Sequence, residues 1–317
     1  MPVSAPTPFL TIGTRGSPLA LVQANDVRRR LAGLHQVDEK EIAIKIIKTD
    51  GDRTQSENLS LRDIGGKGLF SKEIEDQLLA KSIDLAVHSA KDMATTLPNG
   101  LIMDVFLVRQ DVRDAFISLT ATTLGELAKG ARVGTSSLRR AAQLRHRRPD
   151  LEIVEFRGNV ATRLKKLGNG VAEATLLAMA GLNRLGQAQK ASSLLDPLEF
   201  PPAPAQGAVG LEMRLNDQRT RDLAAPLDDR PTNQAVVGER AMLEKLDGSC
   251  RTPIGVFSRF KGDRLLVSAQ ILSLDGAQCF SAEASGAPKD STKIGLEVAE
   301  KLIALAGEQF LADLKSA

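Results

Sequence analysis

Short apolar runs alternate with amphipathic stretches through most of this chain. Apolar runs that predict buried strands occupy residues 9–13, 42–46, 83–87 and 101–108. Amphipathic stretches at 18–34 and 69–81 predict helices, and Pro18 stands at a first-turn position that tolerates proline. Strands that alternate with helices are typical of a parallel α/β sheet.

The same alternation begins again near residue 115. Further strands are predicted at 115–119, 131–134, 151–156 and 174–178, with helices beginning near Leu124, Ser137, Val160 and Met179. Proline-rich residues 197–204 indicate a boundary. Residues 206–212 follow it and predict a strand that returns to the first sheet.

The C-terminal part has a different pattern. A helix at 232–246 precedes three predicted strands, at 253–260, 264–273 and 278–285, and a last helix at 290–314. The strands are separated by Gly262 and Gly276, which mark hairpin turns. We therefore expect two doubly wound α/β domains, 1–108 with 206–226 and 109–205, and a small α+β domain, 227–317, with a three-stranded antiparallel sheet.

Composition excludes several classes of partner. Lys and Arg total 42 against 39 Asp and Glu, a net charge of +3, and Trp and Tyr are absent. Nucleic-acid binding is therefore not expected, because it needs a strong basic field or stacking aromatics. The 2 Cys and 3 His show no metal-ligand spacing. Residues 1–8 do not resemble a signal peptide and no long apolar run follows, which predicts a cytoplasmic protein without a membrane partner.

Arginines recur where predicted strands pass into helices. They stand in Thr14-Arg15-Gly16-Ser17, in Gly134-Thr135-Ser136-Ser137-Leu138-Arg139-Arg140 and in Arg157-Gly158-Asn159. Helix N-termini attract anions, and guanidinium fits carboxylate or phosphate with two parallel bonds. Ligands of open α/β sheets lie beyond the carboxyl ends of strands, so we expect these loops to converge on a polyanion in one cleft between two domains. Exposed, solvated charge remains the alternative for Arg15 and Arg157.

Two further residues have candidate chemistry. Asp92 follows Lys91 at a predicted strand end, where it is either a surface ion pair or cap, or a carboxylate that moves protons and stabilises a developing cation. Cys250 lies in a polar loop beside Arg251, which favours thiolate, whereas Cys279 beside Phe280 is expected to be a small buried hydrophobe. Lys67, in a glycine-rich loop, is either a lid contact or an ordinary loop lysine.

These segments, in this order, resemble the porphobilinogen deaminase family. The matching stretches are 14–20, 66–70, 87–92, 134–140, 157–163, 180–185, 204–208 and Cys250 ahead of Pro253-Ile254-Gly255. Each motif is weak alone, but the ordered set is specific and spans nearly the whole chain.

The resemblance implies a fold and an activity. The fold is two periplasmic-binding-protein-like domains around a cleft and a third domain that carries a cysteine. The activity is that of a transferase of porphyrin and heme biosynthesis, which joins four porphobilinogen molecules into linear hydroxymethylbilane and releases ammonia. Its primer is dipyrromethane, attached through a thioether, and the family expectation is a monomer.

The resemblance also assigns roles to residues. Cys250 would hold the dipyrromethane, and Asp92 would be the catalytic carboxylate. Lys67 and Phe70 would belong to a lid. Binding of substrate and cofactor carboxylates would fall to Arg15, Ser89, Lys91, Ser136, Arg139, Arg140, Arg157, Arg163, Arg184 and Gln206.

Two rival functions are compatible with an arginine-rich cleft. A solute-binding protein for an organic polyanion would need neither Cys250 nor Asp92 and would normally carry an export signal. A phosphate-handling enzyme would need a Walker-type loop or an acidic metal cluster, and the sequence shows neither.

Overall fold

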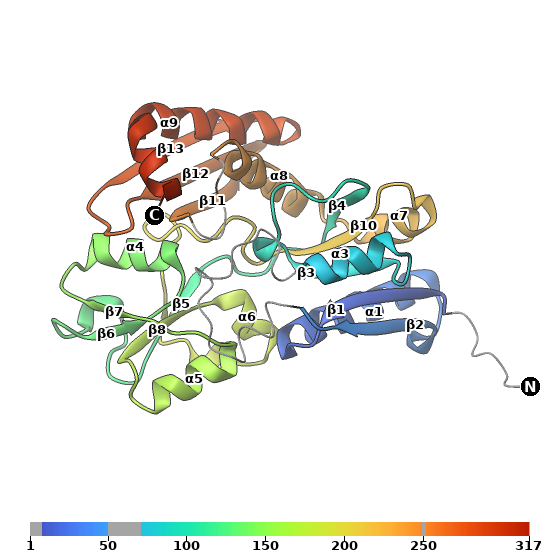
Figure 1. The fold of residues 1–317 in the computed structure, drawn as a ribbon, viewed down its shortest axis with the longest axis horizontal. Helices are drawn as coiled ribbons and strands as arrows, with labels where there is room; N and C mark the ends of the chain where they lie inside the picture. Colours follow the sequence, from blue (N-terminus) through green and yellow to red (C-terminus); the bar gives the residue numbers. More distant parts are fainter. Residues whose placement is uncertain (1–7, 50–70, 247, 249–251, 317) are drawn as a thin grey trace, which may run out of the picture. The chain divides into compact units, whose positions relative to one another are not determined.

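The computed structural model describes residues 8–49, 71–246, 248 and 252–316. The chain forms two compact units, each built from two separate stretches (Figure 1). Unit 1 consists of residues 1–108 and 209–229, and unit 2 of residues 109–208 and 230–317.

Unit 1 has a five-stranded sheet in the order β2-β1-β3-β10-β4. Its strands are β1 (Leu10–Arg15), β2 (Ile42–Ile47), β3 (Leu85–Ser89), β4 (Leu101–Phe106) and β10 (Val209–Arg214). β1 is parallel to β2 and β3, whereas β10 is antiparallel to β3 and β4. The predicted return of the chain to the first sheet is confirmed. The prediction of a fully parallel sheet is wrong for β10. The chain re-enters the sheet at the carboxyl end of β3, where Val209 is opposite Ser89, and β10 therefore runs antiparallel to β3.

The helices that the structure describes in unit 1 cover this sheet. They are α1 (Pro18–His35), α3 (Lys72–Leu79) and α7 (Gln218–Ala224), with 3₁₀ turns η1 (Glu39–Glu41), η2 (Ala90–Asp92) and η5 (Ala225–Leu227). The Ser17 hydroxyl accepts from the Ala20 N–H at 3.3 Å and caps α1, while Val27 and Leu31 join the core beside Leu10. α3 begins at Lys72, and residues 69 and 70 of the predicted helix lie outside the described part of the chain.

Unit 2 contains a second five-stranded sheet, in the order β7-β6-β8-β5-β9. Its strands are β5 (Asp114–Ser118), β6 (Arg132–Gly134), β7 (Glu152–Val154), β8 (Ala174–Ala178) and β9 (Ser193–Leu194). β6 is parallel to β7 and β8, and β5 is antiparallel to β8 and β9. The two sheets therefore share one arrangement, three parallel strands followed by an antiparallel strand.

Three helices belong to this second sheet. They are α4 (Leu138–Arg147), α5 (Val160–Gly168) and α6 (Met179–Arg184), close to their predicted starts, with η4 (Ala188–Lys190) after them. The helix expected near Leu124 is only a 3₁₀ turn, η3 (Leu124–Glu126). The reason is local, since Thr123 and Glu126 close a capping box around a single turn.

The third sheet of the molecule, also in unit 2, is the antiparallel meander β11 (Ile254–Lys261), β12 (Arg264–Leu272) and β13 (Cys279–Gly286). Helices α8 (Arg230–Lys245) and α9 (Ser291–Ser316), with η6 (Pro288–Asp290) before α9, pack on it around Val256, Val267 and Val298. α9 is interrupted at Gly307, whose φ of 80° is not helical. The prediction of one continuous helix at the C-terminal end is therefore wrong at this residue.

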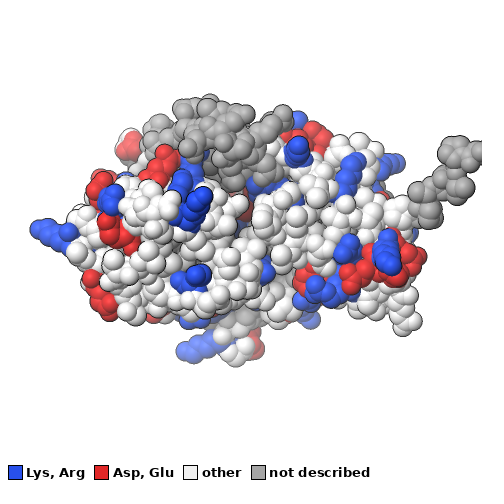
Figure 2. All heavy atoms as spheres, turned by 90° about the horizontal axis from the view of Figure 1, so that it is seen from below, with Lys and Arg blue, Asp and Glu red and all other residues white. Residues whose placement is uncertain are grey.

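Both predicted fold classes, doubly wound α/β and small α+β, are confirmed by these strand orders. Separation of unit 2 into two domains stays a prediction, although the α/β part and the meander have separate cores. On the face drawn in Figure 2, basic and acidic side chains are interspersed, as expected from a net charge of +3. Within the described ranges, every helix is too short or too polar to cross a membrane.

Candidate active site

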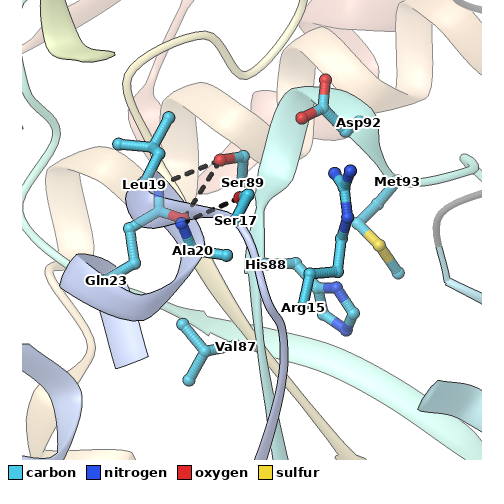
Figure 3. A pocket seen from close by; sticks show the side chains of 10 residues that line it. All are labelled: Arg15, Ser17, Leu19, Ala20, Gln23, Val87, His88, Ser89, Asp92 and Met93. Atoms are coloured by element: carbon cyan, nitrogen blue, oxygen red, sulfur yellow. Dashed lines mark hydrogen bonds between the residues drawn. The ribbon is translucent and has the colours of Figure 1, made fainter. Parts of the chain in front are cut away.

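A pocket in unit 1 lies where β1 and β3 end (Figure 3). Its wall includes Arg15 from the end of β1, Ser17 and Gln23 from the start of α1, Ser89 from the end of β3 and Asp92 from the 3₁₀ turn η2 that follows. The position follows from the topology, because parallel strands bring their carboxyl ends to one edge of the sheet. The predicted grouping of Arg15, Ser89 and Asp92 thus lies within one unit.

Local structure fixes each of these side chains. β3 ends at Ser89, and the 3₁₀ turn η2 then carries Lys91 and Asp92 past the strand. Gln23, only 3% exposed, donates from Nε2 to the Ser89 hydroxyl at 2.9 Å. In Figure 3 the Arg15 guanidinium and the Asp92 carboxylate extend toward the same side of the pocket. A carboxylate in the wall of this pocket can stabilise a cationic reaction centre.

A buried group of ionisable side chains lies behind the pocket. His88 also lines it, and its Nε2 is 2.9 Å from Oε2 of Glu212, whose side chain is fully buried. Glu75 is nearby on α3, and burial raises the pKa of its carboxyl, with Glu212 adding to that rise. The structure therefore places His88 in a buried pair with a carboxylate.

In unit 2, two predicted binding arginines share one carboxylate. Arg139 and Arg140 are each 5% exposed, and both donate to Asp114. The distances are 2.9 Å from Arg139 Nη2 and 2.7 Å from Arg140 Nη2. Burial would raise the pKa of the Asp114 carboxyl, but the two guanidinium groups outweigh burial and hold that pKa well below its usual range. Asp114 therefore compensates part of the positive charge that Arg139 and Arg140 bring to the first turn of α4.

Gln206 joins the same cluster from a distant segment. Its Nε2 donates to Asp114 Oδ1 at 2.9 Å and to the Val112 carbonyl at 2.7 Å. Sequence reasoning named Gln206 and both arginines but missed Asp114. The available signal was a charged residue opening an otherwise apolar strand, Asp114-Ala115-Phe116-Ile117.

The other predicted residues of unit 2 lie in loops at the carboxyl end of its parallel strands or on the helices that follow. Arg157 pairs with Glu155, and Arg163 Nε donates to the Gly158 carbonyl at 2.9 Å. Arg184 Nη2 donates to the Gly207 carbonyl at 2.7 Å. Ser136 accepts from the Phe156 N–H at 3.0 Å. Convergence of these groups with Arg15 and Asp92 stays a prediction.

Several predicted residues cannot be placed. Cys250, Lys67 and Phe70 lie outside the described residues. The second cysteine, Cys279, is half-buried in β13, and burial raises the pKa of its thiol. A raised pKa disfavours thiolate, but Cys279 is only half-buried and so is not the small buried hydrophobe expected from the sequence.

Comparison with known proteins identifies the family. The model of "Porphobilinogen deaminase, dipyromethane cofactor binding domain" matches residues 10–222, and that of "Porphobilinogen deaminase, C-terminal domain" matches residues 233–304. The chain belongs to the porphobilinogen deaminase family. The resemblance seen in the ordered motifs is thereby confirmed, and with it dipyrromethane as the cofactor of the family's first domain.

Full-length relatives agree. The chain is 52% identical over 293 residues to a porphobilinogen deaminase of Paracoccus denitrificans, covering 92% of this chain and 93% of the relative. It is 51% identical over 300 residues to that of Nitrobacter hamburgensis, covering 95% and 94%. Among solved structures, a periplasmic substrate-binding protein of an ABC transporter from Coxiella burnetii is similar over 73% of this chain and 97% of its own, with 14% identity and a TM-score of 0.42.

Proposed function

We propose that this chain is a cytoplasmic, monomeric transferase that makes hydroxymethylbilane from four molecules of porphobilinogen. The proposal depends on one observation, the match of residues 10–222 and 233–304 to the two domains of the porphobilinogen deaminase family. The pocket that holds Asp92 with Arg15 supports it, because the reaction passes through a cation and its substrates are carboxylates.

Each addition breaks one bond and forms another. The aminomethyl group reacts as its ammonium form, so that when the C–N bond breaks the electron pair leaves with nitrogen as neutral ammonia. The remaining cation is attacked by the free α-carbon of the growing chain, which forms a C–C bond and then loses a proton. Asp92 acts twice in this scheme. Its carboxylate stabilises the cation, and it accepts the proton that restores aromaticity.

The residues of unit 2 fit the dipyrromethane cofactor, which carries acetate and propionate groups. Arg139 and Arg140 face one carboxylate, Asp114, so this cluster has more positive than negative charge. Together with Arg157, Arg163 and Arg184 it would hold the carboxylates of the cofactor and of the growing chain. Dipyrromethane, when bound, supplies the free α-carbon that receives the first unit. Attachment to Cys250 would make each addition effectively intramolecular.

The mass of the purified protein tests this function directly. We expect the wild-type protein to exceed its sequence mass by one dipyrromethane group and to consume porphobilinogen with release of ammonia. Cys250→Ser should have the sequence mass and no turnover, while Cys279→Ser, the matched control, should keep the added mass. An unmodified wild-type protein that still makes hydroxymethylbilane would refute the covalent attachment of dipyrromethane to Cys250. A protein that binds porphobilinogen without ammonia release would instead support a solute-binding function.

A further inference from the structure

The Asp114 carboxylate is the common contact of three residues that the sequence singled out for ligand binding. Oδ2 accepts from Arg139 Nη2 at 2.9 Å and from Arg140 Nε at 3.2 Å. Oδ1 accepts from Arg140 Nη2 at 2.7 Å and from Gln206 Nε2 at 2.9 Å. Its side chain is 1% exposed, so water does not share these bonds to any extent. One buried carboxylate thus orients side chains from two distant segments.

The charges of this cluster do not balance. Two guanidinium groups face one carboxylate, and the remaining contacts of Arg139 are neutral. Its Nη1 donates at 2.9 Å both to Gln143 Oε1 and to the Pro201 carbonyl. Gln143 is itself 2% exposed and donates to the same carbonyl. Uncompensated buried charge is unfavourable, so the cluster would be stabilised by an arriving anion.

The bonds to Asp114 also determine which edge of each guanidinium remains available. Arg140 uses Nε and Nη2 on Asp114, and its Nη1 makes no hydrogen bond with the described residues. Arg139 uses both terminal nitrogens, and its Nε is buried without a partner among those residues. Asp114 therefore fixes the plane of Arg140 and leaves Nη1 as its available donor.

We propose that Asp114 is a positioning residue, which holds Arg140 so that Nη1 and one uncompensated positive charge meet a carboxylate of the pyrrole chain. The inference depends on the proposed function for the identity of that carboxylate. Gln143 supports this arrangement, because its neutral side chain contacts Arg139 without cancelling the net positive charge of the cluster. A glutamate there would accept from Arg139 as Gln143 does, yet would bring the cluster to zero net charge.

Two variants separate positioning from folding. Gln143→Glu keeps both arginines and Asp114, and Asp114→Asn keeps the shape of the side chain while removing its charge. We expect Gln143→Glu to fold with a lowered melting temperature, because glutamate cannot donate to the Pro201 carbonyl as Gln143 does. Its KM for porphobilinogen should rise about 10- to 100-fold, the equivalent of one charge-assisted hydrogen bond, with a much smaller change in kcat. Gln309→Glu, an exposed residue of α9, adds the same charge elsewhere and should leave both constants unchanged.

Asp114→Asn should lower kcat/KM by about 100-fold, because Arg140 loses its fixed orientation. In a protein that already carries Arg140→Leu, Asp114→Asn should lower kcat/KM little further, since the arginine that Asp114 orients is already absent. If Asp114→Asn does not fold, Gln143→Glu decides the question alone. Wild-type KM in Gln143→Glu would overturn the inference. Failure of the wild-type protein itself to carry dipyrromethane or to consume porphobilinogen would overturn the proposed function instead.

Discussion

His88 and Glu212, 124 positions apart in the chain, form a buried pair with 2.9 Å between Nε2 and Oε2. β3 and β10 bring them together, because β10 returns to the first sheet beside β3. His88 also lines the pocket that holds Asp92, so a residue of the pocket wall has a fully buried carboxylate as its partner. Burial raises the pKa of the Glu75 carboxyl, and the charge of Glu212 adds to that rise.

Replacing Glu75 by glutamine should stabilise the protein increasingly as pH rises. Burial raises the pKa of Glu75 above its unfolded value, and the neighbouring Glu212 adds to that rise. Glu75 therefore favours folding in its protonated form at low pH, and this contribution is lost as pH rises through the folded-state pKa. Thermal unfolding of both proteins between pH 4 and pH 9, values chosen about the usual carboxyl range, measures the effect. A difference in melting temperature that shrinks as pH rises would contradict it.

Replacing Asp92 by asparagine should leave the attached dipyrromethane in place but lower kcat by at least about 100-fold. The amide cannot accept the α-proton or stabilise the cation as a carboxylate does. Intact mass and single-turnover ammonia release measure the two effects separately. Asp263→Asn, in an exposed turn of the meander, is the matched control and should behave as wild type. Normal turnover in Asp92→Asn would exclude this residue from the mechanism.

Replacing Glu239 by glutamine should cost about 3–5 kcal/mol of stability. Glu239 is fully buried and binds Arg109 through both oxygens, at 2.8 and 2.9 Å, and also accepts from the Ala205 N–H at 2.6 Å. The substitution leaves a guanidinium that is only 11% exposed without its counter-ion. Urea unfolding measures the loss. Glu297→Gln breaks an exposed pair with Lys301 and should cost less than about 1 kcal/mol, so equal losses would contradict the prediction.

Replacing Gly207 by alanine should be more damaging than the same change at Gly130. Both glycines have positive φ, +90° and +78°, so alanine is strained by about 1–2 kcal/mol at either position. At Gly207 the new Cβ would also lie 2.5 Å from the Gln110 carbonyl oxygen, whereas Gly130 has nothing within 4 Å. We expect lower thermal stability for Gly207→Ala and a smaller fraction of the protein carrying dipyrromethane, because Gln206 is adjacent. Similar melting temperatures for the two variants would show that the backbone relaxes without cost.

Most strands could be predicted because their apolar runs are short and bounded by polar turns. The strand at 174–178 has the predicted bounds, and the three strands of the meander differ from prediction by about one residue at each end. Strand direction was harder. The antiparallel insertion of β10 depends on where the chain re-enters the sheet, and periodicity does not report that. Likewise, the 3₁₀ turn at Leu124 and the break at Gly307 are local conformations that an apolar pattern does not distinguish from a helix.

The candidate site could be predicted only in part. Unusual charge at a helix start pointed to Arg139 and Arg140, and the family resemblance added Gln206. Their partner was not visible, because Asp114 lies 25 positions before Arg139 and nothing in a linear pattern assigns a carboxylate to one guanidinium among many. The same holds for Gln23, which reaches Ser89 across 66 positions. Such contacts depend on side-chain geometry after folding.

The position of β10 in the sheet also affects how the protein folds during translation. In the sheet of unit 1, β10 lies between β3 and β4. The ribosome makes β10 only after residues 109–208, so this sheet is incomplete until Arg214 has been synthesised. Until then one edge of β3, the strand that leads to Asp92, has no partner strand in the nascent chain. We expect the second α/β sheet to be the first to form during translation, although it comes later in the sequence.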